Sequence, residues 1–339
     1  MHSWKALLEA MDDARNEAHS SGVRAPLVSA GLVVVQQYRL RRKIANGGMG
    51  CIWEADDLDL GRIVAVKFLA DSLCQDEVSL KRFDREARSA ARLRTPYAAQ
   101  VYAHGTIERV PYIVMERLYG EDLHARLERV GRMPLNAIAK VATEACKALR
   151  EAHSIGIIHR DLKPANLFLS THDGEETTKL VDFGVARDEL SLESITRTGV
   201  RVGSPSYMSP EQVSGDRVLD GRTDLWSLGV IIYRALTGKK PFSGDTPVVM
   251  RKIAEERARA PSTICPGLPP SADVFMKRAL ATDRNKRFRD ANEFLEAFQA
   301  VVWSARQEWP AVQPRVPTPI PIPDDADPQK RTTWRPPSR

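Results

Sequence analysis

The chain has 339 residues, of which 42% are hydrophobic and 28% are charged. This composition is typical of a folded protein with a substantial core, and it argues against a disordered or fibrous chain. The 50 lysines and arginines exceed the 44 acidic residues by enough to give a net charge of +6. That excess is too mild for a dedicated nucleic-acid binder, and we expect no nucleic-acid partner.

The cysteine pattern and the hydropathy indicate the compartment. The four cysteines form no C-x-x-C pair and fit neither a zinc site nor a disulfide framework, so we expect reduced thiols. The start of the chain lacks the basic region and apolar run of a signal peptide. No segment approaches the roughly 18 apolar residues that a membrane span requires. We therefore expect a soluble, cytoplasmic protein without a membrane partner.

The N-terminal extension, residues 1–37, has one helical pattern. Ser3 could cap a helix whose apolar residues recur at helical spacing, at Trp4, Leu7, Leu8 and Met11. We expect this amphipathic helix to pack on the rest of the chain or on a partner, and a loose solvated helix is the alternative.

A single large domain is expected over residues 38–302. Short strand patterns, broken by one helix over residues 79–93, run from Tyr38 to Met115, and helical patterns follow beyond Glu121. The expected fold is α+β, with a small β-rich lobe and a larger α-helical lobe. A cleft between two such lobes is a natural place for a nucleotide.

The last segment, residues 303–339, changes composition. From Pro310 its closely spaced prolines prevent helix and strand, so we expect an extended or disordered tail. A plain linker or terminus is the first interpretation of this tail, and docking of a polyproline-binding domain at Pro314–Pro317 is the alternative.

A glycine-rich segment lies between the first two expected strands. Glycines let the backbone approach phosphates closely and donate its N–H groups, although such a cluster is also typical of a simple hairpin turn. The segment consists of Ile44, Ala45, Asn46, Gly47, Gly48, Met49, Gly50, Cys51 and Ile52.

The following strand ends on Lys67, and the helix after it carries Glu86. A lysine at this point is often only a solvated strand end. A buried lysine needs an anionic partner, however, and Glu86 can supply it while the amine reaches phosphate oxygens.

Two further segments carry the strongest signal. The loop His159-Arg-Asp-Leu-Lys-Pro-Ala-Asn166 combines a possible base, two cations and a metal-binding amide. An apolar strand then leads into Asp182-Phe-Gly, whose carboxylate could hold Mg²⁺, a cation that prefers oxygen ligands. Either segment alone could be an ordinary polar loop, but the ordered series is highly specific.

This series resembles the Hanks-type protein kinases, and most closely the bacterial serine/threonine kinases. The resemblance extends to Ser209-Pro-Glu211, to Asp224 in an Asp-Leu-Trp-Ser-Leu-Gly segment and to Arg287. It implies a bilobal kinase fold and transfer of the γ-phosphate of ATP to serine or threonine hydroxyls of proteins.

The resemblance also implies roles for individual residues. Asp161 resembles the catalytic base, and Lys163 resembles the cation that faces the transferred phosphate. Asn166 and Asp182 resemble the Mg²⁺ ligands. Lys67 resembles the lysine that binds phosphates, and Glu86 resembles the residue that orients it. The adenine would be enclosed by Ile44, Ile52, Ala65, Met115 and Phe168. A hinge from Glu116 to Leu118 would recognise the edge of the base.

Some positions depart from the family pattern. Ala45 replaces the first glycine of the glycine-rich loop, and Arg284 stands where proline is common. Neither change removes a reacting group. A pseudokinase and a kinase of small molecules remain as alternatives, and the segment from Gly203 to Glu211 argues against the second because it resembles a protein-substrate platform.

Regulation is expected in the segment between Asp182 and Glu211. The resemblance places activating phosphosites at Thr196 and Thr198. We expect autophosphorylation there, with a transient homodimer as one route to it.

Overall fold

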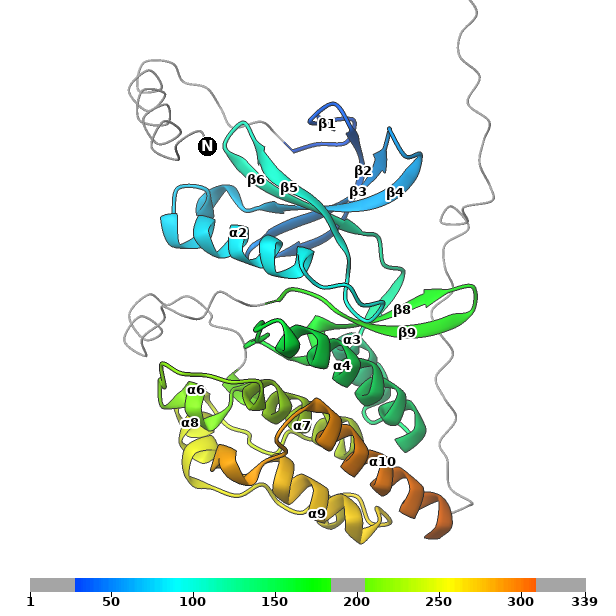
Figure 1. Cartoon of the computed structure of the whole chain (residues 1–339), viewed down its shortest axis with the longest axis vertical. Coiled ribbons are helices and arrows are strands. Elements are labelled where there is room, and N and C mark those ends of the chain that lie inside the picture. Colours follow the sequence, from blue (N-terminus) through cyan, green and yellow to red (C-terminus); the bar gives the residue numbers. More distant parts are fainter. Residues whose placement is uncertain (1–27, 184–204, 309–339) are drawn as a thin grey trace, which may run out of the picture. The chain divides into compact units, whose positions relative to one another are not determined.

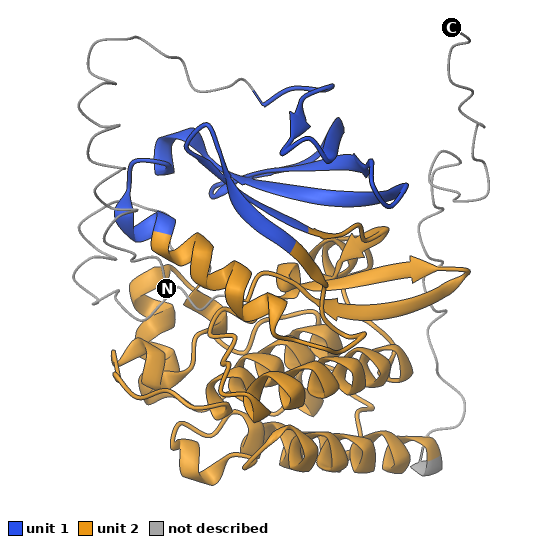
Figure 2. Ribbon diagram, turned by 45° about the horizontal axis from the view of Figure 1, so that its top comes forward, with its two compact units in different colours: residues 1–80, 103–114 blue, residues 81–102, 115–339 orange. Residues whose placement is uncertain are grey.

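The structure, a computed structural model, describes residues 28–183 and 205–308 of the chain. It divides into two compact units (Figure 2). Unit 1 comprises the chain up to Leu80 together with Ala103–Val114, and unit 2 comprises Lys81–Tyr102 and the chain from Met115 onward. The expected N-terminal helix, the phosphosites Thr196 and Thr198, and the Pro-rich tail lie outside the described residues.

Most of unit 1 is a sheet whose strands follow the order β1-β2-β3-β4-β6-β5, and strands β1 to β4 pair antiparallel (Figure 1). The inner strand β4 is buried along its last six residues, as expected for a strand covered on both faces. The edge strand β5 alternates between partly buried and exposed positions, which is the period of two of a half-buried strand. The bounds are β1 Val33–Val34, β2 Tyr38–Gly47, β3 Gly50–Asp57, β4 Arg62–Leu69, β5 Val101–Ile107 and β6 Val110–Glu116.

Helix α2, Glu77–Ala91, matches the helix expected over residues 79–93, and unit 2 begins within it. The rest of unit 2 is mainly helical. Its bounds are α3 Leu123–Val130, α4 Leu135–Ser154, α6 Pro210–Val213, α7 Arg222–Thr237, α8 Thr246–Glu255, α9 Pro270–Ala279 and α10 Ala291–Glu308.

Helix α7 forms the centre of the unit 2 core. All its residues from Thr223 to Thr237 are buried, and it packs against α4 and α9 (Figure 1). It ends at Gly238, which adopts a left-handed conformation with φ of 73° that glycine tolerates without steric cost. Helix α10 also packs against α4 and α9, and it continues to Glu308, past the expected domain end at residue 302.

A second, three-stranded sheet in unit 2 carries the chemistry-bearing loops. Strands β7, Gly120–Asp122, β8, Leu167–His172, and β9, Glu175–Leu180, pair in that order. The β8–β9 turn is Asp173-Gly174, with φ of 49° and 79°. Asp-Gly is a preferred pair for such two-residue hairpins, because both central residues need positive φ.

Among the described residues, none of the helices is both long and apolar enough to cross a lipid bilayer.

Candidate active site

The β8–β9 hairpin brings the two strongest sequence segments together. The loop from His159 to Asn166 enters β8, and Asp182 follows β9. Leu167 pairs with Leu180 in the ladder, and the Val181 amide donates to the Asn166 carbonyl at 3.0 Å. The two expected Mg²⁺ ligands, Asn166 and Asp182, therefore lie on adjacent segments of one unit.

Asp161 and Lys163 form the polar centre of this loop. The Lys163 Nζ donates to Asp161 Oδ2 at 2.7 Å, and both side chains are about one-quarter exposed, at 28% and 26%. The Asn166 amide nitrogen donates to the Asp161 carbonyl at 2.8 Å, and Asn166 is only 4% exposed. The structure thus brings three of the expected catalytic and metal-binding residues into one hydrogen-bonded group.

The backbone of this loop is strained at Arg160, whose φ is 63° although it is not a glycine. Its amide donates to Asp224 Oδ1 at 2.8 Å, and its carbonyl accepts from the Gln212 side-chain amide at 2.7 Å. Gln212 is itself held in a capping box with Ser209 at the start of α6. Both sides of the Arg160 backbone are therefore fixed from outside the loop.

Asp224 is fully buried and accepts three hydrogen bonds. The amides of His159 and Arg160 donate at 2.9 and 2.8 Å, and His153 Nε2 lies 2.8 Å from Oδ2. Burial acts to raise the pKa of the Asp224 carboxyl, but the His153 contact and the His159 amide hold that pKa below its usual value. An ionised Asp224 thus anchors the loop from His159 to Asn166, the candidate catalytic loop.

His159 connects the loop to the segment after β9. Its ring is fully buried, its Nε2 lies 3.2 Å from the Val181 carbonyl, and it packs on Phe183 with ring centroids 4.8 Å apart. Its Nδ1 has no hydrogen-bond partner in the described parts of the chain. Asp182, which lies between these two contacts, is exposed and has a φ of 53°.

The glycine-rich segment forms the β2–β3 hairpin of unit 1. Gly47 pairs with Gly50, which leaves Gly48 and Met49 as the two turn residues. The same hairpin carries Ile44, Ala45, Asn46, Cys51 and Ile52, and the next strand, β4, carries Ala65 and Lys67.

Lys67 is 7% exposed, and its strand position pairs with Ile52. Glu86 lies on α2 in unit 2. The two residues belong to different units, so their pairing stays a prediction.

The expected hinge residues lie in unit 2. Met115 and Glu116 end β6, and Leu118, which is 8% exposed, follows them. The Glu116 amide donates to the Gln100 carbonyl at 2.8 Å, and its carboxylate accepts from Lys179 Nζ at 2.6 and 2.8 Å. Phe168, expected to contact adenine, pairs with Lys179 in the β8–β9 ladder.

The segment that resembles a substrate platform is anchored by a buried ion pair. Arg287 donates to the two Glu211 oxygens at 2.8 and 2.7 Å, and the Thr223 hydroxyl donates to Glu211 at 2.9 Å. Burial acts to raise the pKa of Glu211, but the hydrogen bonds and charge of Arg287 hold it below its usual value. The pair fixes α6, and through Gln212 it fixes the backbone of Arg160.

The donor set suits Mg²⁺ bound together with a phosphate substrate. The described residues contain no cluster of three or more His, Cys, Asp or Glu side chains that could hold a metal alone. Asn166 and Asp182 would supply only an amide oxygen and a carboxylate. Mg²⁺ is ordinarily bound by one or two such protein ligands, with substrate phosphates and water completing the octahedron.

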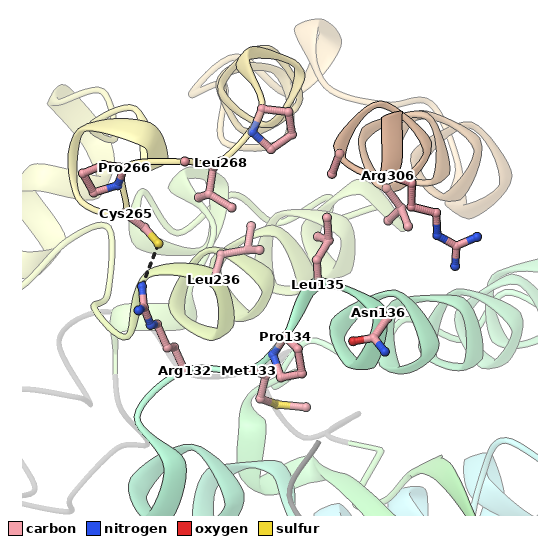
Figure 3. Close-up of a pocket in the computed structure, with 14 residues that line it drawn as sticks. Arg132, Met133, Pro134, Leu135, Asn136, Leu236, Cys265, Pro266, Leu268 and Arg306 are labelled. Atoms are coloured by element: carbon pink, nitrogen blue, oxygen red, sulfur yellow. Dashed lines mark hydrogen bonds between the residues drawn. The ribbon is translucent and has the colours of Figure 1, made fainter. Parts of the chain in front are cut away.

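A separate cavity of about 250 Å³ lies in unit 2 between the ends of several helices (Figure 3). Its wall includes Leu135, Leu236, Leu268 and Val302, and at its edge Arg132 Nη1 lies 2.8 Å from Cys265 Sγ. It shares no residue with the catalytic loop, and we assign it no part in phosphoryl transfer.

Comparison with known proteins identifies the family. The protein kinase domain family matches residues 38–298, so the chain belongs to that family. The serine/threonine-protein kinase PknA of Mycobacterium tuberculosis is 37% identical over 291 residues, which cover 84% of this chain and 65% of PknA. The probable serine/threonine-protein kinase PknB of Bifidobacterium longum is 38% identical over 269 residues, which cover 76% of this chain and 38% of that protein. The chain thus spans less than two thirds of the length of these relatives.

Solved structures agree with this identification. The crystal structure of the Mycobacterium tuberculosis PknI kinase domain matches with a TM-score of 0.66 and 26% identity, covering 82% of this chain and all of that one. The expected α+β kinase fold, with a β-rich and a helical part, is confirmed.

Three positioning residues could not be found from the sequence. Gln212 and His153 contact the catalytic loop or its anchor, and Lys179 contacts the hinge. Each bond joins residues at least 52 positions apart in the chain. The only advance signal was their proximity in sequence to recognised motifs.

Proposed function

We propose that this chain is a serine/threonine protein kinase that transfers the γ-phosphate of ATP to protein hydroxyls. The observation that carries the proposal is the hydrogen-bonded group of Asp161, Lys163 and Asn166, held on a strained loop by the buried Asp224. Such rigid placement is what phosphoryl transfer requires of a protein, because little covalent chemistry falls to it.

Each residue has one task in this proposal. Asp161 accepts the proton of the substrate hydroxyl and orients its oxygen toward the phosphorus. Lys163, at 2.7 Å from Asp161, faces the transferred phosphoryl group and balances its charge. Asn166 and Asp182 would hold Mg²⁺, which neutralises phosphate charge when bound. Lys67, oriented by Glu86, would bind the other phosphates.

Apolar side chains would enclose the base of ATP. The Glu116 amide already donates a hydrogen bond to the Gln100 carbonyl. The hinge would therefore bind the base through the Glu116 carbonyl and the Leu118 backbone. The residues proposed to contact its faces are Ile44, Ile52, Ala65, Met115 and Phe168.

Two features favour serine and threonine as acceptors. Lys163 stands at a position where serine/threonine kinases carry lysine, and the matching relatives are named serine/threonine kinases. The anchored segment around Glu211 and Arg287 supports a protein substrate over a small molecule. We further propose that the kinase phosphorylates Thr196 and Thr198 in its own chain.

The first prediction tests catalysis with labelled ATP and a generic protein substrate. Asp161→Asn should lower the rate by at least about a hundredfold, because it removes the group that takes the proton. Its circular dichroism and melting temperature should match those of wild type. Asp59→Asn, which changes an exposed carboxylate, is the control and should keep full activity.

The proposal fails if wild type transfers no phosphate to any protein in the presence of ATP and Mg²⁺. It also fails if Asp161→Asn retains near wild-type activity. ATP binding without transfer by wild type would favour the pseudokinase alternative.

A further inference from the structure

Glu116 is held on two sides by bonds within unit 2. On one side Lys179 Nζ contacts both carboxylate oxygens, at 2.6 and 2.8 Å. On the other side Glu116 and Gln100 are joined twice, by the Glu116 amide at 2.8 Å and by the Gln100 amide to Glu116 Oε2 at 3.3 Å. A residue bonded through both its backbone and its side chain has little freedom to change its backbone direction.

Gln100 is itself a fixed point. Its side-chain amide donates to the carbonyls of Thr95 and Ala98 at 3.0 and 3.3 Å. The adjacent Ala99 amide donates to the Leu180 carbonyl at 2.9 Å. The chain from Thr95 to Gln100 therefore connects one side of Glu116 to strand β9.

Lys179 lies on the same strand β9, opposite Phe168 and three residues before Asp182. Its side chain is 13% exposed and that of Glu116 is 25% exposed, so the ion pair is largely removed from water. Partly desolvated pairs with two short N–O contacts are stronger than exposed ones, which are often worth little.

We propose that Lys179 is a positioning residue for ATP, a role that rests on the proposed function. Acting through the Glu116 carboxylate, Lys179 sets the direction of the hinge backbone that reads the base. It also ties that backbone to the strand leading into the metal ligand Asp182.

A direct contact between Lys179 and a phosphate is the competing role for a lysine near Asp182. The geometry argues against it, because the amine is already bonded to two carboxylate oxygens. If the Lys179 amine moved to a phosphate, the partly buried Glu116 carboxylate would lose its cation, which is unfavourable.

The experiment compares Lys179→Met and Lys179→Arg with wild type in steady-state kinetics. Lys179→Met should raise the KM for ATP about five- to tenfold and leave kcat at saturating ATP within about twofold, because the hinge contacts the base and not the reacting phosphorus. The KM for the protein substrate should not change. Lys179→Arg keeps the cation and should restore most of the affinity.

Lys140→Met is the matched control. Lys140 Nζ also lies 2.6 Å from a glutamate, Glu144, and that glutamate accepts the Thr178 amide on the same strand β9. If Lys179 acted only by stabilising β9, the control would raise the KM for ATP equally, and the inference would be wrong.

A double-mutant cycle separates action through Glu116 from direct action. In a Glu116→Gln background, Lys179→Met should raise the KM for ATP by less than twofold, because the Glu116 carboxylate that Lys179 contacts is already lost. A full effect in that background would overturn the inference. Equilibrium binding of a fluorescent ATP analogue gives an independent readout.

Failure of the wider function can be told apart. If wild type and Lys179→Met bind the analogue with equal affinity, only the positioning role is contradicted. Wild type without any affinity for ATP contradicts both the kinase function and this role.

Discussion

Gly50, at the end of the β2–β3 turn, has a conformation and surroundings that exclude a side chain. Its φ is 146°, and a Cβ built there would lie 1.9 Å from the Phe68 carbonyl oxygen. Gly48, two residues earlier, has no atom within 4 Å of such a Cβ. The two glycines therefore have different reasons to be present in one hairpin.

We predict that Gly50→Ala lowers the free energy of unfolding by about 2 kcal/mol or more, because β4 must move away from the hairpin. Gly48→Ala, the matched control, should change it by less than about 0.5 kcal/mol. Urea unfolding followed by fluorescence measures both. Equal stability of the two variants would contradict the close approach of Gly50 to β4.

The residues that act on substrate could be predicted from the sequence, whereas their supports could not. The sequence shows these residues directly because they belong to short motifs of fixed spacing, which contain Asp161, Asn166 and Asp182. Gln212 bonds to Arg160, 52 positions away in the sequence, and Lys179 bonds to Glu116, 63 positions away. Their contacts depend on packing that no local pattern records.

The helices and strands followed from local patterns where apolar periodicity was strong. The helical patterns expected beyond Glu121 include the helices α4 and α7, whose ends depend on caps and packing. The short helix α6 was not expected, since it has only four residues and depends on its capping box and on Glu211. Tertiary bonds decide such short elements.

The Glu211–Arg287 pair joins α6 to the segment before α10, and its strength should depend on pH. The Glu211 pKa is held below its usual value by Arg287, against the effect of burial. A carboxyl with a lowered folded-state pKa stabilises the fold fully above its unfolded-state pKa of about 4.3. That contribution is lost as the pH falls from there through the folded-state pKa.

We predict that Glu211→Gln lowers the free energy of unfolding by about 3 to 5 kcal/mol at pH 7, since it leaves the Arg287 guanidinium buried without its anion. The difference from wild type should stay constant down to about pH 5 and shrink below about pH 4. Chemical unfolding at several pH values measures it.

Glu255→Gln removes an exposed pair with Arg251 and serves as the control. It should cost less than about 0.5 kcal/mol at any pH. A Glu211→Gln effect that grows as the pH falls would contradict the sign of the pKa shift.

At the scale of the whole molecule, the division into a strand-rich and a helical part was predictable, because strand patterns dominate up to Met115 and helical patterns dominate beyond Glu121. The charged surroundings of Arg160 could not be predicted from the sequence. Burial lowers the pKa of its guanidinium, and the charge of Arg85 on α2 lowers it further, while Asp224 acts in the opposite direction. Two arginines close enough to interact, within unit 2, are a favourable place for an added anion.

We predict that phosphorylation of Thr196 and Thr198 supplies this anion and activates the kinase. A phosphate carries about two negative charges and would form charge-assisted hydrogen bonds with the Arg160 guanidinium. Protein treated with phosphatase should be at least about tenfold less active than protein preincubated with ATP. The Thr196→Ala/Thr198→Ala double variant should gain little from that preincubation.

A Ser191→Ala/Ser194→Ala double variant is the matched control, because it removes two hydroxyls from the same segment. It should be activated by ATP as wild type is, and mass spectrometry should find phosphate on Thr196 and Thr198 in it. If the threonine double variant gains as much activity as wild type, the activating phosphate lies elsewhere. If Arg160→Ala abolishes activation while phosphate still accumulates on both threonines, the guanidinium is the group that reads the phosphate.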